Sequence, residues 1–500
     1  MAPTPRFDPA DCARVEVAKR LEPLSRKSLV EMFEVFQHRP GDSQTAAHRA
    51  IYPTIRLNGD DMTWRLDIPK PCALMAAAAL ALTCNASAQE YAPAVQKHLD
   101  AATVNAAGDQ ALIDYVRRNS CFEVEDNTWR TWARSHIGQR VPLLQIFDDL
   151  WFVGDKYTGM YFLKTADGGV LLIDALNNTA DANDYIVPAL QQLGLPLRGI
   201  YISHGHGDHD GGVNRLRQVY GFDFPVFLGS GDAAGKLYQP TPIDSTNDAV
   251  QPVVIGGTTL LVQAAPGHTP GNQISLIPVH KQGVRHLLVM NWRSAVPGSA
   301  SGSKLYLQGV EKVYWMARAN GAVGFVHTHP ISDATLPTIN TIMSTGSRDT
   351  VPLIFGGERT TRATAVAREC SAARAQQIDA TALFPVWRVT SLSFLDSGPA
   401  LKKLSARITN GWGPVAGQEV TFSVEASGSV CRAVSDNDGV AECKSRMSLR
   451  SGEKVKAAFA GNSTSDFYDL PSEVSQVMTS PACIAGSSGK VPPGNGLTCR

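Results

Sequence analysis

Apolar residues fall in short runs separated by turn residues over most of this chain. From Val141, three such runs follow one another in the pattern typical of successive strands of an antiparallel sheet. They are LLQIFDDLWFVG, GMYFLKTADG and GVLLIDAL. A helical period then covers 181–194, and a buried strand, LRGIYIS, ends at His204.

Strand-like runs and helical periods continue to alternate up to about residue 385. The pattern predicts strands over 224–229 and 322–328, two strand pairs within 252–290, and helices over 212–221, 304–321 and 357–383. Because the strands come in runs with helices between them, we predict an α+β fold over 141–385, neither a pure barrel nor a simple doubly wound sheet. A mainly helical segment, 89–140, precedes it.

The C-terminal part of the chain has a different pattern. Short strand-like runs separated by turn signals recur over 388–477, which predicts a small all-β sandwich. The stretch GPVAGQEVTFSVEASGSVCRAVSDNDGVAECKS resembles bacterial immunoglobulin-like repeats. We expect this domain to act as a spacer, a stabiliser or a contact surface, and 478–500 to form a Cys-containing tail.

An apolar segment near the N-terminus has the features of a secretory signal peptide. Its apolar run, ALMAAAALAL, is far shorter than the roughly 20 residues of a membrane span. Arg65 and Lys70 precede it, and Ala86-Ser87-Ala88 follows, which predicts cleavage before Gln89. We therefore expect a signal peptide over 62–88, a start at Met62, a non-native extension over 1–61, and a periplasmic or secreted protein. The alternative is a buried core helix.

Cysteine usage agrees with export. The chain has 9 Cys, and six remain when Cys12, Cys72 and Cys84 are set aside. Six cysteines allow fifteen pairings, so the sequence alone does not fix the connectivity. Cys431 and Cys443 flank the turn Asp-Asn-Asp-Gly, and a hairpin there would bring them together. Disulfides indicate an oxidising compartment, and six buried thiols are the alternative.

Charge excludes some classes of partner. The chain has 46 basic and 46 acidic residues, so its formal net charge is zero, and no extended basic field exists to bind nucleic acid. Hydrophobic residues make up 43% of the chain and charged residues 18%, which excludes wholesale disorder. We expect a small-molecule substrate, no nucleic acid and no stable membrane span.

The segment SHGHGDHDGG, at 203–212, concentrates chemistry at the end of a strand. Imidazole and carboxylate groups are ligands that suit zinc. Because four ligands cannot complete two metal sites, more should follow at later strand ends. His268 lies in GHTPG after one strand, and His327 and His329 lie in HTHP after another. Each is a candidate ligand.

These motifs resemble the metallo-β-lactamase superfamily, whose signature is H-x-H-x-D-H followed by distant single ligands. The resemblance covers about 141–380 and is strongest to the β-lactamase subclass with all His and Asp ligands. It implies an αββα sandwich with two zinc ions at one edge. It assigns His204, His206 and His268 to the first zinc, and Asp208, His209 and His329 to the second. His327 is the rival of His329, which is preferred because it directly precedes Pro330.

Two other acidic or amide positions bear on that resemblance. Asp174 either orients the His-rich loop or is a turn residue after a strand. Asn291 stands where many relatives, including thioester hydrolases, carry a metal-bridging Asp. This disfavours the thioester and phosphodiester branches.

The resemblance implies an exported dizinc hydrolase that uses a metal-bound hydroxide to open a cyclic amide, as a β-lactamase does. Asp208 would also be catalytic, orienting the nucleophile or passing a proton. One alternative is a hydrolase of lactones or other esters. A second alternative is a non-catalytic surface-binding protein that acts through its immunoglobulin-like domain. Substrate identity, the metal in vivo and oligomeric state are left open by the sequence.

Overall fold

The computed structural model describes residues 54–57, 64–67, 90–349, 352–396, 403–424, 428–445, 449 and 452–478. Strands β1 (Thr54–Leu57) and β2 (Trp64–Asp67) pair antiparallel and belong to a unit that ends at Glu90. Apart from these strands and Met478, the predicted extension, signal peptide and C-terminal tail lie outside the described residues. The second unit is Tyr91–Arg500, which contains everything described below.

A first sheet has seven strands in sequential order, β3 to β9. Strands β3 to β6 are antiparallel, as the three apolar runs after Val141 predicted, and β6 to β9 are parallel. Their bounds are β3 Arg140–Gln145, β4 Leu150–Asp155, β5 Gly159–Lys164, β6 Val170–Ile173, β7 Leu197–Tyr201, β8 Val226–Gly229 and β9 Thr241–Ile243.

A second sheet has five strands, again in sequential order. The predicted strand pairs within 252–290 form its antiparallel part, and the last strand joins in parallel. The bounds are β10 Gln251–Ile255, β11 Thr258–Ala264, β12 Gln273–Lys281, β13 Val284–Met290 and β14 Phe325–Val326.

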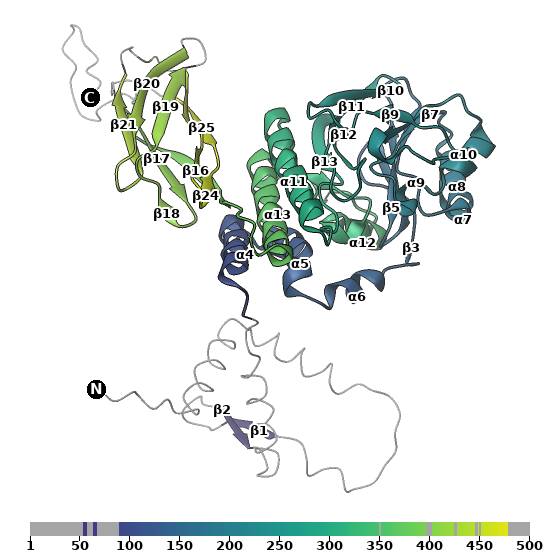
Figure 1. The fold of residues 1–500 in the computed structure, drawn as a ribbon, viewed down its shortest axis with the longest axis horizontal. Helices are drawn as coiled ribbons and strands as arrows, with labels where there is room; N and C mark the ends of the chain where they lie inside the picture. Colours follow the sequence, from purple (N-terminus) through teal and green to yellow (C-terminus); the bar gives the residue numbers. More distant parts are fainter. Residues whose placement is uncertain are drawn as a thin grey trace, which may run out of the picture. The chain divides into compact units, whose positions relative to one another are not determined.

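The two sheets share one apolar core, with helices on their outer faces (Figure 1). Phe152 and Tyr161 of the first sheet pack with Ile277 and Leu288 of the second. A continuous helical segment over 179–193 (α7, η3 and α8) and α10 (Val213–Tyr220) cover the outer face of the first sheet. Helices α4 (Pro93–Ala106), α11 (Ala300–Asn320) and α13 (Gly357–Ile378) cover the second sheet. This helix–sheet–sheet–helix order is the predicted αββα sandwich.

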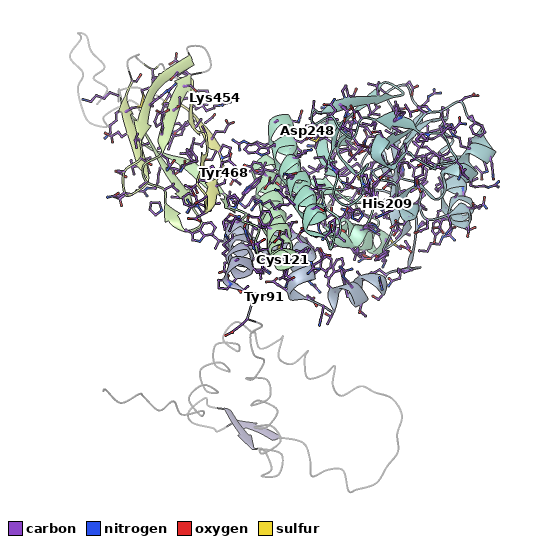
Figure 2. All side chains as sticks on the ribbon, in the orientation of Figure 1. Tyr91, Cys121, His209, Asp248, Lys454 and Tyr468 are labelled. Carbon is purple, nitrogen blue, oxygen red and sulfur yellow. A yellow bond between two sulfur atoms is a disulfide. The ribbon has the colours of Figure 1, made fainter. Side chains whose placement is uncertain are left out.

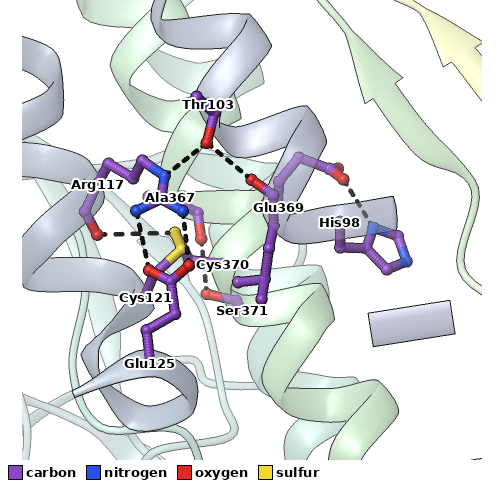
Figure 3. The surroundings of a disulfide bond; sticks show 10 residues. His98, Thr103, Arg117, Cys121, Glu125, Ala367, Glu369, Cys370 and Ser371 are labelled. Atoms are coloured by element: carbon purple, nitrogen blue, oxygen red, sulfur yellow. Dashed lines mark hydrogen bonds and ion pairs between the residues drawn. A yellow bond between two sulfur atoms is a disulfide. The ribbon is translucent and has the colours of Figure 1, made fainter. Parts of the chain in front are cut away.

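The N-terminal helices are joined to this sandwich by a disulfide (Figure 3). Ala107, with φ 51°, ends α4, so the first part of the predicted helical segment 89–140 divides into α4, η2 (Leu112–Arg117) and α5 (Arg118–Glu125). Cys121 of α5 is bonded to Cys370 of α13, and both are buried. The chain then passes through the short helix α6 (Trp129–Arg134) and enters strand β3. Two further helices, α9 (Gly207–Asp210) and α12 (Thr335–Thr345), complete this part.

The C-terminal residues form a second, all-β sandwich around its own apolar core. One sheet contains β16 (Thr390–Asp396), β17 (Lys403–Asn410), β18 (Gly413–Pro414) and β21 (Val440–Lys444). The other contains β20 (Gly428–Val434), β19 (Glu419–Val424), β22 (Lys454–Phe459) and β25 (Ser472–Val477). A third, short sheet contains β15 (Val386–Arg388), β24 (Phe467–Asp469) and β23 (Asn462–Ser463).

Cys431 and Cys443 are bonded, but the expected hairpin between them is wrong. Cys431 lies on β20 and Cys443 on β21, and these strands belong to different sheets. The Asp-Asn-Asp-Gly turn therefore carries the chain from one sheet to the other, and the disulfide joins the two sheets.

In the described part of the chain, no helix combines the length and the apolar character that a membrane span requires.

Candidate metal centre

Four strand ends carry the polar residues of the candidate site. Strand β7 ends at Tyr201 and leads into the loop 203–206 and helix α9. Asp174 follows β6, the loop with His268 follows β11, and His327 and His329 follow β14. Because these strands run in one direction within packed sheets, their carboxyl ends converge at one edge. His209, labelled in Figure 2, lies in this α/β part.

The six predicted ligands lie in two groups of three. Within each group, the atoms that could bind a metal lie within 4.8 Å of one another. The groups are His204, His206 and His268, and Asp208, His209 and His329. In the first group, His204 Nε2 is 3.2 Å from His206 Nδ1. In the second, His209 Nε2 is 3.2 Å from His329 Nε2, and Asp208 Oδ2 is 3.4 Å from His329 Nε2.

Hydrogen bonds on the outer side of the imidazole rings fix their tautomers. Four Nδ1 atoms face oxygen acceptors: His204 faces Ser203 Oγ (3.1 Å), His209 faces Asp174 Oδ2 (2.6 Å), His268 faces Ala295 O (3.2 Å) and His329 faces Tyr157 O (2.8 Å). Backbone carbonyl and carboxylate oxygens only accept, and the Ser203 hydroxyl already donates its hydrogen to Asp174 Oδ2, so each facing Nδ1 carries its hydrogen. In a neutral imidazole the inward Nε2 then presents a lone pair.

These inward lone pairs indicate that a metal ion fits the site. The Nε2 atoms of His209 and His329 face each other at 3.2 Å with no hydrogen to share between them in the neutral tautomers. Two lone pairs at this distance repel unless a cation lies between the ligand atoms. Three nitrogen ligands in one group, and two nitrogens with a carboxylate in the other, suit a divalent ion such as zinc.

Local electrostatics keep the first group ready to bind a cation. Burial, and the charge that neighbouring histidines would carry, hold the pKa of His204 well below its usual value. The ring of His268 keeps partial contact with solvent, yet enclosure by the surrounding protein and the charge of His206 lower its pKa to about 4. Both rings are therefore neutral at pH 7, the form that ligation needs.

Charged neighbours shift the pKa values of Asp208 and His209 in the second group. Burial alone would raise the pKa of Asp208, but the hydrogen bond from His329 and the charges of His209 and His329 lower it below its usual range. Burial alone would lower the pKa of His209, but the Asp174 carboxylate raises it. Because the carboxylates of Asp208 and Asp174 both lie here, the second group is the more negatively charged half of the site.

Asp174 orients the His-rich loop, as one of its two predicted roles requires. Its fully buried carboxylate accepts hydrogen bonds from Ser203 N (2.8 Å), Ser203 Oγ (3.0 Å) and His209 Nδ1 (2.6 Å). Its φ of 63° is a left-handed conformation that costs a non-Gly residue free energy. Strain of this kind is typical of residues that position a site.

Asn291 cross-links two ligand-bearing segments. Its Oδ1 accepts hydrogen bonds from Thr328 N (2.9 Å) and Thr328 Oγ1 (3.0 Å), and its Nδ2 donates to Asp174 Oδ2 (3.3 Å). The side-chain amide is therefore engaged on both sides, between Asp174 and the residue that precedes His329.

His327 lines the cavity at the site but belongs to neither ligand group. His327 Nε2 is 2.7 Å from Arg293 O, and His327 Nδ1 accepts a hydrogen bond from His329 N (2.8 Å). Both ring nitrogens of this buried residue have partners among the backbone. The structure thus brings His329, not His327, into the second group.

One wall of the site was missed by sequence reasoning. A cavity of about 220 Å³ at the two groups is also lined by side chains of α5 and α6. Phe122 stacks on Trp129 with ring centroids 3.8 Å apart. Arg130, Arg134 and Arg293 line the same cavity, and among the described residues Asp208 is its only acidic lining residue. The segment WRTWAR was the available signal, but it is too short for a periodic pattern.

Comparisons with known proteins agree with this geometry. Residues 154–281 match the family model described as the metallo-beta-lactamase superfamily. This range contains Asp174 and five of the six candidate ligands, and His329 lies beyond it. A hydroxyacylglutathione hydrolase of Shewanella halifaxensis is 34% identical over 141 residues, which are 28% of this chain and 47% of that protein. An uncharacterized protein of Bacillus subtilis, YobT, is 34% identical over 150 residues, which are 27% of this chain and 63% of that protein. The chain spans about half the length of the curated relatives it matches.

Solved structures with a similar chain trace include two metallo-beta-lactamases. The native FEZ-1 enzyme from Legionella gormanii is 18% identical with a TM-score of 0.39, covering 48% of this chain and 96% of that one. BJP-1, a subclass B3 enzyme of Bradyrhizobium japonicum, is 21% identical with a TM-score of 0.36, covering 47% of this chain and 94% of that one.

Proposed function

We propose that this chain is a dizinc hydrolase of the metallo-β-lactamase superfamily, whose family model matches residues 154–281. His204, His206 and His268 would hold one zinc ion, and Asp208, His209 and His329 the other. The observation that carries this proposal is the convergence of inward lone pairs in two groups of three. Two zinc ions there would supply Lewis acidity and lower the pKa of water from 15.7 towards roughly 7.

Asp208 would orient the attacking water instead of taking up its proton. Its carboxylate lines the cavity, and its pKa lies below the usual range. A weak base of this kind remains charged at neutral pH and accepts hydrogen bonds throughout the reaction. We therefore propose ligation and orientation as its two roles.

The charge of the cavity supports an anionic substrate. Arg134 and Arg293 line it, together with Arg130, which is ion-paired with Glu123 at 2.7 Å, and a bound metal would offset the charge of the acidic lining residue Asp208. A guanidinium group recognises a carboxylate well. Phe122 and Trp129 add an apolar wall for a non-polar substituent. These features favour a cyclic amide that carries a carboxylate, as a β-lactam does, over a neutral lactone.

An ester or thioester is the second candidate substrate. Several curated relatives are named hydroxyacylglutathione hydrolase, which favours this reading. Against it stands Asn291, a neutral amide already engaged with Asp174 and Thr328, where thioester-cleaving relatives would carry a bridging carboxylate.

A panel of substrates on the zinc-loaded protein tests the proposal. We expect hydrolysis of a chromogenic cephalosporin, with a slower or undetectable rate on an acyl lactone and on S-lactoylglutathione. His206→Ala should lose one zinc equivalent and nearly all hydrolysis. His286→Ala is the matched control, since His286 is a half-buried histidine of β13 outside the cavity. Full turnover by His206→Ala with undiminished zinc would overturn the assignment, and zinc binding without any hydrolysis would favour a non-catalytic binding protein.

We also propose that the protein is exported and that its immunoglobulin-like domain, 388–477, is a separate module from the hydrolase domain, 141–385. Two disulfides among the described residues support an oxidising compartment. Mass spectrometry of the mature protein should find an N-terminus at Gln89. Limited proteolysis should release the C-terminal module. An N-terminus upstream of Met62 would contradict the export proposal.

A further inference from the structure

Asp232 lies outside both ligand groups, yet it contacts the two loops that carry the first group. It ends the short helical turn η4 (Ser230–Asp232) that follows β8. Its Oδ2 accepts hydrogen bonds from Gly205 N (2.7 Å) and from Thr269 Oγ1 (2.6 Å), and its Oδ1 accepts one from Gly271 N (2.9 Å). Gly205 stands between His204 and His206, and Thr269 directly follows His268. One carboxylate therefore joins the backbone next to all three members of the group.

The glycines beside this carboxylate make the contact possible. A Cβ at Gly205 would lie 2.7 Å from Asp232 Cβ, and a Cβ at Gly271 would lie 2.6 Å from Asp232 Cγ. Side chains cannot approach so closely, so any other residue at either position would push the carboxylate out. Because both loops present bare backbone, Asp232 can fit between them.

Lys236 holds the other backbone group of Gly205. Its Nζ donates a hydrogen bond to Gly205 O (2.7 Å) and forms an ion pair with buried Asp210 (2.5 Å). Gly205 thus has its N–H held by Asp232 and its carbonyl held by Lys236. The turn between His204 and His206 is fixed from both sides by one segment of the chain.

The second group has a different support. Asp174 accepts a hydrogen bond from His209, whereas the hydrogen bonds of Asp232 within the described residues come from Gly205, Thr269 and Gly271. Asp174 also reaches the first group through Ser203, which faces His204, but in the described part of the chain it contacts no backbone beside His206 or His268. Asp174 contacts a ligand ring, and Asp232 contacts the backbone between ligands.

We propose that Asp232 is the positioning residue of the first metal position, and this inference rests on the proposed metal-dependent function. Without its carboxylate, three donors from two loops lose their shared acceptor, and His206 and His268, which both reach solvent, lose their fixed separation. An asparagine cannot replace it, because its one oxygen can serve only part of the donor set and its NH₂ group would face an N–H or O–H donor. Partners of this outer kind typically change metal affinity by about 10–100-fold.

The test measures zinc and cobalt binding to the full chain, independently of hydrolysis. In Asp232→Asn, titration against a competing chelator should show one of the two ions bound about 10–100-fold more weakly and the other unchanged. Thr269→Val, which removes one of the three donors, should give a smaller loss at the same position. Asp379→Asn is the control, because Asp379 also accepts from a Thr hydroxyl and a backbone N–H, but at the end of α13.

Two readouts separate positioning from a general loss of structure. The melting temperature of metal-free Asp232→Asn should match that of the metal-free parent, and only the increase on adding zinc should shrink. The cobalt absorption spectrum should change for the weakened position. Should Asp232→Asn melt early without metal, Thr269→Val decides: the proposal stands if that variant weakens one ion alone.

The proposal is overturned if Asp232→Asn and Thr269→Val both bind two ions with parental affinity, or if both ions weaken equally. Its failure differs from failure of the proposed function. A parent chain that binds two ions and hydrolyses nothing leaves the role of Asp232 intact. A parent chain that binds no metal removes both.

Discussion

The molecule contains two sandwiches of paired sheets, and they differ at their strand ends. In the α/β sandwich, buried polar residues gather where strands stop, and Asp174, His204 and His209 are all less than 5% exposed. The core of the C-terminal sandwich is apolar, and both candidate metal groups found among the described residues lie in the α/β sandwich. Packed sheets thus provide a scaffold in both parts, and chemistry appears only where loops bring polar groups together.

Backbone strain follows the same division. Asp174, Leu176 and Asn291 have φ values of 63°, 57° and 52°, and all three lie at or beside the site. In the described part of the C-terminal sandwich, the residues with positive φ are glycines, for which this conformation carries no steric cost. The α/β sandwich therefore gives up stability at the edge that bears the site, and other contacts must offset it.

The largest difference between the two parts should appear when their disulfides are removed. Cys121 and Cys370 are 249 residues apart, and Cys431 and Cys443 are 12 apart. Loop-closure entropy predicts a loss of about 5 kcal/mol for the first bond. We expect the pair of changes Cys121→Ser and Cys370→Ser to lower the free energy of unfolding of the α/β part by most of that amount in urea denaturation. Unchanged stability would mean that α5 is held to α13 by packing alone.

Removal of one metal ligand should have the next largest effect. His268 lies alone on its loop, so His268→Ala leaves the first group with two ligands. We expect roughly a thousandfold lower kcat/KM, equivalent to about 4 kcal/mol of transition-state stabilisation. Zinc content should fall from two ions to one, as measured by metal analysis after dialysis, and the C-terminal sandwich should keep its stability. Equal turnover by this variant would exclude His268 as a ligand.

The smaller loop of the C-terminal disulfide predicts a smaller loss. Replacement of Cys431 and Cys443 by Ser should cost about 3 kcal/mol in the unfolding of this sandwich, because a 12-residue loop loses less entropy. Zinc binding should stay at the parental level, since the bond lies in the part without the site. A change in zinc affinity would show that the two parts are coupled.

The sequence allowed the fold and the ligands to be predicted because both depend on local signals. The H-x-H-x-D-H segment follows a strand, and histidines follow two later strands. These positions predicted that His204, His268 and His329 lie close together. What failed depends on contacts between segments distant in sequence. Asp232 follows Gly in an ordinary turn, and nothing local indicates that its carboxylate receives donors from residues 205, 269 and 271.

The two other failures have the same origin. Trp129 and Phe122 lie on short helices, where no periodicity can predict which side chains face a cavity. The Cys431–Cys443 bond was expected across a hairpin, because a tight turn between two strands has the same sequence whether the strands pair or belong to opposite sheets. Tertiary packing decides between these outcomes.

The smallest effect we predict concerns the Asp174 carboxylate. Asp174→Asn removes the negative charge that raises the pKa of His209 and leaves one oxygen for the donors around it. Whichever way the amide is turned, its NH₂ group only donates, so either His209 Nδ1 or Ser203 N loses its acceptor. The second metal position should then bind zinc about 10–100-fold more weakly, with a smaller loss at the first, because Ser203 also contacts His204. Asp167→Asn, an exposed turn residue of the first sheet, is the control for loss of one carboxylate. Chelator competition measures the two affinities separately, and a larger loss at the first position than at the second would contradict the assignment of Asp174 to the second group.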